Sequence, residues 1–322
     1  MFASHGATLR RFEICSTLAN QEILNVDWLA LPSNPELSPM FGNTLNCHDI
    51  KNLKVQVLHL DEGIALANLI RAQKQLIKFS LLNSNFFASI VVQALTSHTK
   101  SLDYLSFKHM TNGNGYFNTP PFFNRSSCQL STNAIDAIVQ CVNVTKLTFK
   151  QCEGLNFPKY DPISTAFPNL TSLTYRFGGC KDYDYSTPLK FLSSLVRTRC
   201  NTLEIIDFYW STKEVLDISQ LIQAITQCTI NLKCLNIPLY TVEQLSLIYQ
   251  FCNKLENLKI NLFKTINPNK ALELFANESH DNLKDIYISL YIYKHDVDFD
   301  ETQLDKIFSD IFLKNKQIKR LF

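Results

Sequence analysis

The sequence predicts an α/β solenoid, in which short parallel strands alternate with helices, and three observations support this class. A six-residue pattern of apolar positions recurs through most of the 322 residues. Segments with a helical period of apolar residues separate the recurrences. The composition, 46% hydrophobic and 19% charged, can form a large core and excludes a disordered chain. A domain count based on length alone does not apply to chains built from repeats.

The recurring pattern is apolar-x-x-apolar-x-apolar. Its last three residues alternate as in a strand with one buried face, and its first apolar residue belongs to the turn that enters the strand. The copies are LIKFSL from Leu76, LDYLSF from Leu102, VTKLTF from Val144, LTSLTY from Leu170, LEIIDF from Leu203, LKCLNI from Leu232, LENLKI from Leu255 and LKDIYI from Leu283, with a weaker VQVLHL from Val55. Apart from one step of 42 residues, the spacing scatters around that of leucine-rich repeats. Isolated matches could arise by chance in an apolar chain, but this many copies in register indicate a repeat.

The segments between the copies are predicted to be helices, because their apolar residues recur at i, i+3, i+4 and i+7. The positions are Phe87, Ile90, Val91 and Ala94, then Ile218, Leu221, Ile222 and Ile225, and finally Leu304, Ile307, Phe308 and Ile311. Thr187 before Pro188 predicts one helix start, and Thr241 with Gln244 predicts a capping box at another. One strand and one helix cannot bury their apolar faces alone, so neighbouring copies must stack.

Cysteines precede several copies at a similar distance. Cys141, Cys200 and Cys252 lie three residues before the pattern, Cys228 lies one residue further off, and Cys152 follows a predicted strand. The chain therefore resembles the cysteine-containing leucine-rich repeats of F-box proteins over roughly residues 50–315. Its irregular repeats, rich in Asn, Lys and Phe, are similar to those of F-box families in some fungi. The resemblance implies a curved horseshoe with parallel strands on the concave face and helices on the convex face.

In that family an F-box docks a Skp-type adaptor of a cullin-RING ubiquitin ligase, and the repeats bind the substrate. No F-box is recognisable, because the segment after Leu31-Pro32 lacks a helical pattern and residues such as Phe12 already fit the repeat template. We therefore expect degenerate repeats or a cap over 1–50 and the solenoid over 51–322. The F-box is either lost or missing from the gene model, and a Skp-type partner is expected only if an upstream F-box exists.

The expected function is a protein–protein interaction scaffold, the substrate-recognition part of an F-box-type ubiquitin-ligase adaptor. A stand-alone binding protein without a link to ubiquitin ligases is the alternative. In either case we expect a monomer that binds a protein partner. The element that would distinguish the two roles is the F-box.

Side chains that flank the apolar strand residues point out of the core and are expected on the concave face. The middle positions are His59, Ser80, Ser106, Thr148, Thr174, Asp207, Asn236, Lys259 and Tyr287. Earlier positions include Lys78, Tyr104, Lys146, Lys233 and Asp285, and positions just after the strands include Lys108, Lys150, Arg176 and Tyr209. Basic residues outnumber acids in this set. The face is either an ordinary solvated surface or a basic surface for an acidic or phosphorylated protein segment.

A loop rich in Gly, Pro and Asn is predicted at about 108–130. Loops of this length inside a repeat are usually functional or disordered. It carries four aromatic residues, Tyr116, Phe117, Phe122 and Phe123. These are either anchors for a partner or side chains that fold back over the core. A shorter loop after Tyr175 leaves its strand in the same sense, so both loops should emerge from one edge.

No catalytic residue, metal-ligand set or cofactor motif is recognisable: the sequence has no P-loop, GxSxG, HExxH or paired CxxC. We therefore expect neither enzyme activity nor a cofactor. A net charge of +2 and a pI near 8.0 give no support for nucleic-acid or membrane binding. The N-terminus lacks a signal-peptide pattern, so the ten dispersed cysteines indicate reduced thiols in the cytoplasm or nucleus.

Overall fold

The computed structural model describes side chains within residues 48–57, 60–82, 84, 87–110, 130–131, 133–150, 152, 165–176, 185–210, 216–228, 231–262, 270–275, 282–289 and 309. It describes the backbone alone at 11–13, 132, 177, 268–269, 276–277, 290 and 320–321. The chain forms two compact units, unit 1 (Met1–Asn169) and unit 2 (Leu170–Phe322). Each unit is an α/β structure with a parallel sheet, as the sequence predicts. No helix in the described part of the chain has the length and apolar character needed to cross a membrane.

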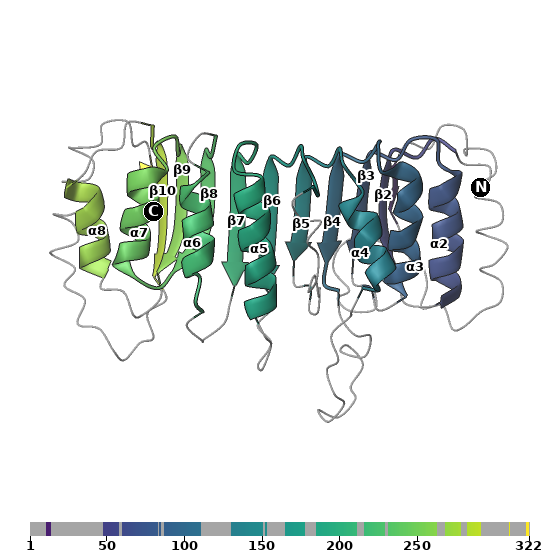
Figure 1. Cartoon of the computed structure of the whole chain (residues 1–322), viewed down its shortest axis with the longest axis horizontal. Helices are drawn as coiled ribbons and strands as arrows, with labels where there is room; N and C mark the ends of the chain where they lie inside the picture. The colour runs from purple at the N-terminus through teal and green to yellow at the C-terminus, as the bar shows by residue number, and fades with distance from the viewer. Residues whose placement is uncertain are drawn as a thin grey trace, which may run out of the picture. The chain divides into compact units, whose positions relative to one another are not determined.

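Unit 1 has a parallel sheet whose strand order is the chain order. The strands are β1 (Arg11–Glu13), β2 (Asn52–Gln56), β3 (Lys78–Leu82), β4 (Tyr104–Lys108) and β5 (Lys146–Lys150). Between them lie α2 (Leu60–Ala72), α3 (Ala88–Ala94), the 3-10 helix η2 (Leu95–His98) and α4 (Thr132–Val139). The strand order advances in one direction along the chain, and crossovers between parallel strands are right-handed, so the described helices of this unit lie on one face of its sheet (Figure 1).

Unit 2 repeats this arrangement. Its strands are β6 (Ser172–Phe177), β7 (Ile205–Trp210), β8 (Cys234–Leu239), β9 (Asn257–Leu262), β10 (Asp285–Leu290) and β11 (Arg320–Leu321), again parallel and in chain order. The helices between them are α5 (Ser186–Thr198), α6 (Ser219–Thr226), α7 (Val242–Phe251) and α8 (Pro268–Asn277). They too lie on one face of their sheet (Figure 1).

The two apolar residues of each strand stand in rows across the sheet. In unit 1 one row is Leu53, Phe79, Leu105 and Leu147, and the next is Val55, Leu81, Phe107 and Phe149, all of them buried. The ring of Phe107 stacks on that of Phe149 with 5.5 Å between their centroids. This register confirms the predicted strands, because only one side of each strand enters the core.

The weak copy of the pattern at Val55 was placed in the wrong register. Leu53 and Val55 align with Phe79 and Leu81, so the copy starts at Ile50, which is buried. The error arose because the apolar alternation of β2 continues into Val57. In addition Leu60, the first residue of α2, was counted as the last apolar residue of the strand pattern. Lys54, and not His59, therefore occupies the middle position of this strand; His59 itself lies outside the described residues.

Helix starts follow the sequence in one case and depart from it in another. Thr241 caps α7, since its hydroxyl accepts the N–H of Gln244, whose side chain in turn accepts the N–H of Tyr240. This is the predicted capping box with one difference. The Gln244 side chain accepts the N–H of Tyr240, one residue before the capping Thr241, and not that of Thr241 itself. By contrast, α5 begins at Ser186, so Thr187 is inside the helix and is not its cap.

Buried donors at the helix ends tie neighbouring repeats together. The thiols of Cys141 and Cys228 each donate to a carbonyl one turn earlier in their own helix, and that of Cys252 lies 3.9 Å from the Ile225 carbonyl of the preceding repeat. In unit 1 Gln73 and His98 hold the equivalent place: Gln73 donates to the Leu69 carbonyl, and His98 Nε2 donates to that of Ile70. The recurring cysteines are therefore one solution to a common need, which is to satisfy carbonyls at a buried helix end.

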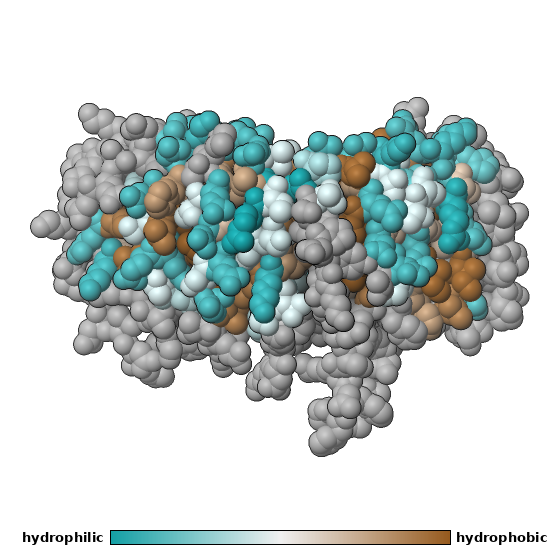
Figure 2. All heavy atoms as spheres, in the orientation of Figure 1, coloured by the Kyte–Doolittle hydropathy of each residue, from teal (hydrophilic) through white to brown (hydrophobic). Residues whose placement is uncertain are grey.

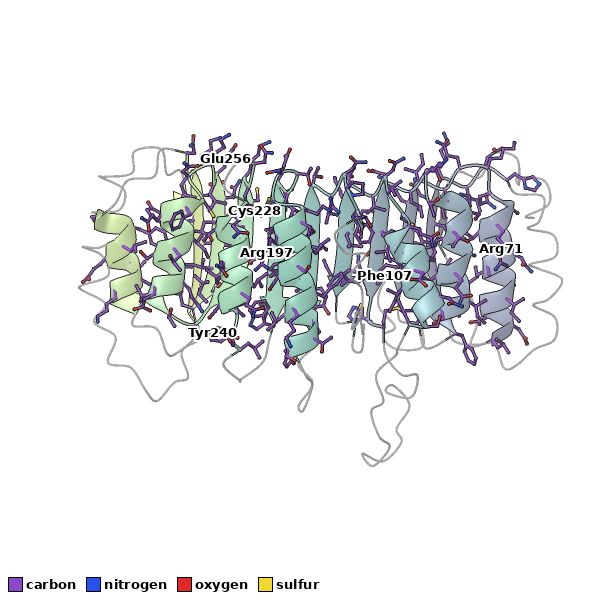
Figure 3. All side chains as sticks on the ribbon, in the orientation of Figure 1. Arg71, Phe107, Arg197, Cys228, Tyr240 and Glu256 are labelled. Atoms are coloured by element: carbon purple, nitrogen blue, oxygen red, sulfur yellow. The ribbon has the colours of Figure 1, made fainter. Side chains whose placement is uncertain are left out.

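Asparagines form a second set of links at the edge where strands begin. Asn143, Asn231 and Asn282 directly precede the first apolar residue of their copies. Their side chains donate to the main-chain carbonyls of Lys100, Asn201 and Asn253, each in the preceding repeat. Glu256 marks the same edge of unit 2 (Figure 3). The described links fix the spacing of successive repeats.

Candidate functional site

Each sheet has one face turned away from its helices, and this face is the candidate site. Its side chains come from alternate strand positions, the first, third and fifth, which lie between the buried ones. These positions form rows across the sheet just as the core residues do. The side chains they carry differ between the two units.

In unit 1 this face is basic, and we name the outward side chains of β2–β5 the lysine face. They are Asn52, Lys54, Gln56, Lys78, Ser80, Leu82, Tyr104, Ser106, Lys108, Lys146, Thr148 and Lys150. Five of them are lysines, and none is Asp or Glu. Local charge on this face is therefore much more positive than the net charge of +2 on the whole chain suggests.

Two lysines lie side by side at the end of the strands. Lys108 and Lys150 are register partners on β4 and β5, and like charges in such positions repel. His109 follows with a left-handed backbone, φ 53°, and its N–H donates to the Lys150 carbonyl at 2.8 Å. Burial, together with the charges of Lys108 and Lys150, lowers the pKa of His109. The positive charges of Lys108 and Lys150 therefore act on His109 at this corner of the lysine face.

A second row crosses the start of the strands. Lys78, Tyr104 and Lys146 are aligned on β3, β4 and β5. Both lysines are exposed, whereas Tyr104 between them is half-buried. In the described part of the chain no carboxylate forms an ion pair with Lys78, Lys108 or Lys146. Their charges are available to a ligand.

In unit 2 the same face is close to neutral. Arg176 Nη2 donates to Asp207 Oδ2 at 2.9 Å, and Asn236 Nδ2 donates to Asp207 Oδ1 at 2.6 Å. The carboxylate of Asp207 therefore neutralises Arg176, which the sequence had placed in a basic surface. Lys259 is exposed in the same row, and Tyr209 lies beside Arg176 on β7.

Some of the predicted positions are corrected by the strand bounds. Lys108, Lys150, Arg176 and Tyr209 were expected just after the strands, but they belong to them, and this puts them on the sheet face. Lys233 was expected on this face, yet β8 begins one residue later, so Cys234 takes the row position.

Lys233 instead belongs to a charge ladder at the edge where strands begin. Its ammonium lies 3.0 Å from Glu204, and Lys284 lies 2.7 Å from Glu256, so acids and bases alternate along this edge of unit 2. The hydrogen bond and charge of Glu204 raise the pKa of Lys233. All four side chains are well exposed, so these pairs contribute little to stability. They nevertheless remove Lys233 from the candidate binding residues.

The predicted aromatic loop cannot be placed in this scheme. Tyr116, Phe117, Phe122 and Phe123 lie outside the described residues. The described helices of each unit present mainly hydrophilic surface with scattered apolar side chains (Figure 2). Among the described residues no three or more His, Cys, Asp or Glu side chains gather in a way that could hold a metal ion.

Comparison with known proteins assigns no family to the chain: no protein-family model matches it, and no curated protein matches its sequence. The functional argument therefore depends on the faces of the two sheets.

Proposed function

We propose that this protein is a scaffold of the leucine-rich-repeat type, which binds a partner protein on the sheet face opposite its helices. The observation that carries the proposal is the ordered rows of polar side chains on that face. Neighbouring parallel strands lie about 4.8 Å apart and rise about 3.3 Å per residue, so the rows form a regular lattice of hydrogen-bonding and charged groups. A polypeptide laid across the strands can contact several repeats at once.

The arrangement of the core supports the same proposal. In both units the helices bury one face of the sheet, and the core rows are filled by large apolar side chains. The other face has no part in closing that core, so its side chains can change without loss of the fold. Such a face suits recognition, because its residues need to match only a partner.

A photo-crosslinking experiment tests this proposal. We would replace Ser80 of β3 and Thr174 of β6, one at a time, by p-benzoylphenylalanine, and compare them with Lys190 of α5 and Gln223 of α6 on the helix side. Irradiation in cells that naturally express the protein should give protein adducts at Ser80 or Thr174 and not at the two helix positions. Equal yields at all four positions, or none at the sheet positions, contradict the proposal.

The cysteine positions favour one particular role for such a scaffold. Cys141, Cys228 and Cys252 are buried at one common place in the repeat, the feature on which the resemblance to F-box repeats depends. We propose, as the more specific function, substrate recognition for an F-box-type ubiquitin ligase. A Skp-type adaptor should then co-purify with the protein expressed from its complete transcript. If crosslinked partners are found and no adaptor accompanies them, the stand-alone scaffold is the better description.

A further inference from the structure

We infer that the lysine face of unit 1 binds an acidic polypeptide segment, with the Lys108–Lys150 pair and the Lys78–Tyr104–Lys146 row as its two contact regions. This inference rests on the proposed scaffold function and names the class of its partner. It depends on three observations: the local charge, the spacing of the lysines and the contrast between the two units.

Three lysines of the lysine face carry charges that no described carboxylate balances. The outward positions of β2–β5 hold no acidic residue, and Lys78, Lys108 and Lys146 form no ion pair in the described part of the chain. In unit 2, by contrast, Arg176 is paired with Asp207 and Lys233 with Glu204. Lys78, Lys108 and Lys146 are therefore open to a ligand that brings negative charge.

The spacing of the lysines fits an extended peptide. Lys78 and Lys146 are two strands apart, which corresponds to about 10 Å between their backbones. Two acidic residues three positions apart in a polyproline II segment lie on the same side of the chain and are separated by about 9 Å. The Lys108–Lys150 pair lies about 13 Å further along the strands, four residues from the first row, and Lys108 there can bind a further carboxylate or phosphate.

The row between the two contact regions consists of Ser80, Ser106 and Thr148. Ser106 and Thr148 are buried, so a ligand would contact the lysines on either side of this row and not these two hydroxyls.

A protein partner explains this surface better than a single-stranded nucleic acid does. Sequence-independent binding of single strands combines a basic groove with several aromatic side chains on which bases stack. The outward positions of β2–β5 carry a single aromatic residue, Tyr104, which is half-buried between two lysines. Its hydroxyl is better placed to donate a hydrogen bond to a carboxylate or phosphate.

The test uses the full chain and fluorescein-labelled 12-residue peptides in an anisotropy titration. One peptide carries glutamate at every third position, a second carries phosphoserine there, and a third carries glutamine. The first two should bind with affinities that fall as salt is raised, and the glutamine peptide should not bind. A 12-residue oligothymidine serves as the nucleic-acid probe.

Two variants with the same change in net charge locate the site. Lys78→Glu/Lys108→Glu/Lys146→Glu should weaken binding of both anionic peptides by about tenfold or more. Lys100→Glu/Lys190→Glu/Arg197→Glu reverses three exposed charges away from the lysine face and should change binding by less than about twofold. Arg197 is seen on the helix side of unit 2 in Figure 3. Circular dichroism and the unfolding temperature check the fold of both variants. If the lysine-face variant unfolds, Lys78→Gln/Lys108→Gln/Lys146→Gln is used in its place.

Each outcome decides the matter. An equal loss of peptide binding in the two charge-reversal variants would show that the peptides respond only to the overall charge of the protein, and this would overturn the inference. Unchanged binding in the lysine-face variant would overturn it as well. Tighter binding of oligothymidine than of either anionic peptide would overturn the choice of a protein partner. Crosslinks at Ser80 that survive when the anionic peptides do not bind would reject the acidic class and leave the scaffold function standing.

Discussion

Trp210 donates its indole N–H to the Tyr240 hydroxyl over 2.6 Å, and both side chains are buried in unit 2. Trp210 is the last residue of β7 and Tyr240 follows β8, yet the described pairing of these strands stops at Asp207 and Asn236. Pro238 lies just beyond that point and has no N–H to donate. The side-chain bond therefore joins the ends of two strands where main-chain pairing has ceased.

Removal of the Tyr240 hydroxyl should be costly. Tyr240→Phe leaves the buried N–H of Trp210 without its acceptor, so the free energy of unfolding should fall by about 1–3 kcal/mol. Urea titration followed by tryptophan fluorescence measures the loss. Tyr104→Phe, on the lysine face, is the matched control and should change stability by less than about 0.5 kcal/mol. Equal losses in the two variants would show that the bond has no stabilising role.

Stability should decline in mildly alkaline solution because of the buried thiols. Burial raises the pKa of Cys141 and of Cys252 to about 12, whereas an exposed thiol ionises near about 8.5. From about pH 8.5 upwards the unfolded chain has released protons that the folded chain retains, so the free energy of unfolding falls as pH rises. Below that pH the contribution is fully present.

The double variant Cys141→Ala/Cys252→Ala tests this explanation. Between about pH 8.5 and 9.5 its free energy of unfolding should fall less steeply with pH than that of the natural protein. Measurement below about pH 10 avoids overlap with Tyr240, whose pKa burial raises to about 12. An unchanged slope in the double variant would assign the pH dependence to other groups.

Gln73 should stabilise unit 1 through its two buried hydrogen bonds. Its side chain accepts the N–H of Ile50 at 2.8 Å and donates to the Leu69 carbonyl at 2.7 Å. Gln73→Ala leaves both main-chain groups unsatisfied and should cost about 1–3 kcal/mol. Gln75→Ala, two residues along and exposed, should cost less than about 0.5 kcal/mol in the same urea titration. A similar effect at both positions would mean that water replaces the bonds of Gln73.

Neutralising Asp207 should give the sheet face of unit 2 a net positive charge. Asp207→Asn removes the carboxylate that pairs with Arg176, so the glutamate peptide should bind a few-fold more tightly. Glu204→Gln removes the same charge from the edge of the sheet and should have a smaller effect, because Glu204 lies outside the rows of the sheet face. Equal gains in the two variants would indicate that only the net charge matters.

The sequence predicts the repeated elements well because each depends on local periodicity. The stripe Leu221, Ile222 and Ile225 is buried along α6, and Thr241 caps α7 as expected. The copy at Val55 failed because alternating residues run directly from β2 towards α2, and local pattern alone cannot choose between two registers.

The charge state of the candidate site was harder to predict. Arg176 and Asp207 are 31 residues apart, and only the register of β6 against β7 brings them together. Lys233 was placed on the face in error, because the alternation that buries Leu235 and Ile237 turns Cys234, and not its neighbour Lys233, away from the core. One signal was overlooked: asparagine directly precedes the pattern at Asn143, Asn169 and Asn231, and this recurrence could have indicated the asparagine links at the edge where strands begin.

The early end of the β7–β8 pairing has a mechanical consequence. A sheet of parallel strands pulled from its two ends loses one strand at a time, since each strand is bonded only to its neighbours. Three residue pairs join β7 to β8, whereas six join β8 to β9, so the first of these seams is the weaker. Under tension β7 should therefore separate from β8 before β8 separates from β9, and each released repeat should lengthen the chain by about 90–100 Å, the contour of one extended repeat. The protein would yield gradually under load and would not break in one event.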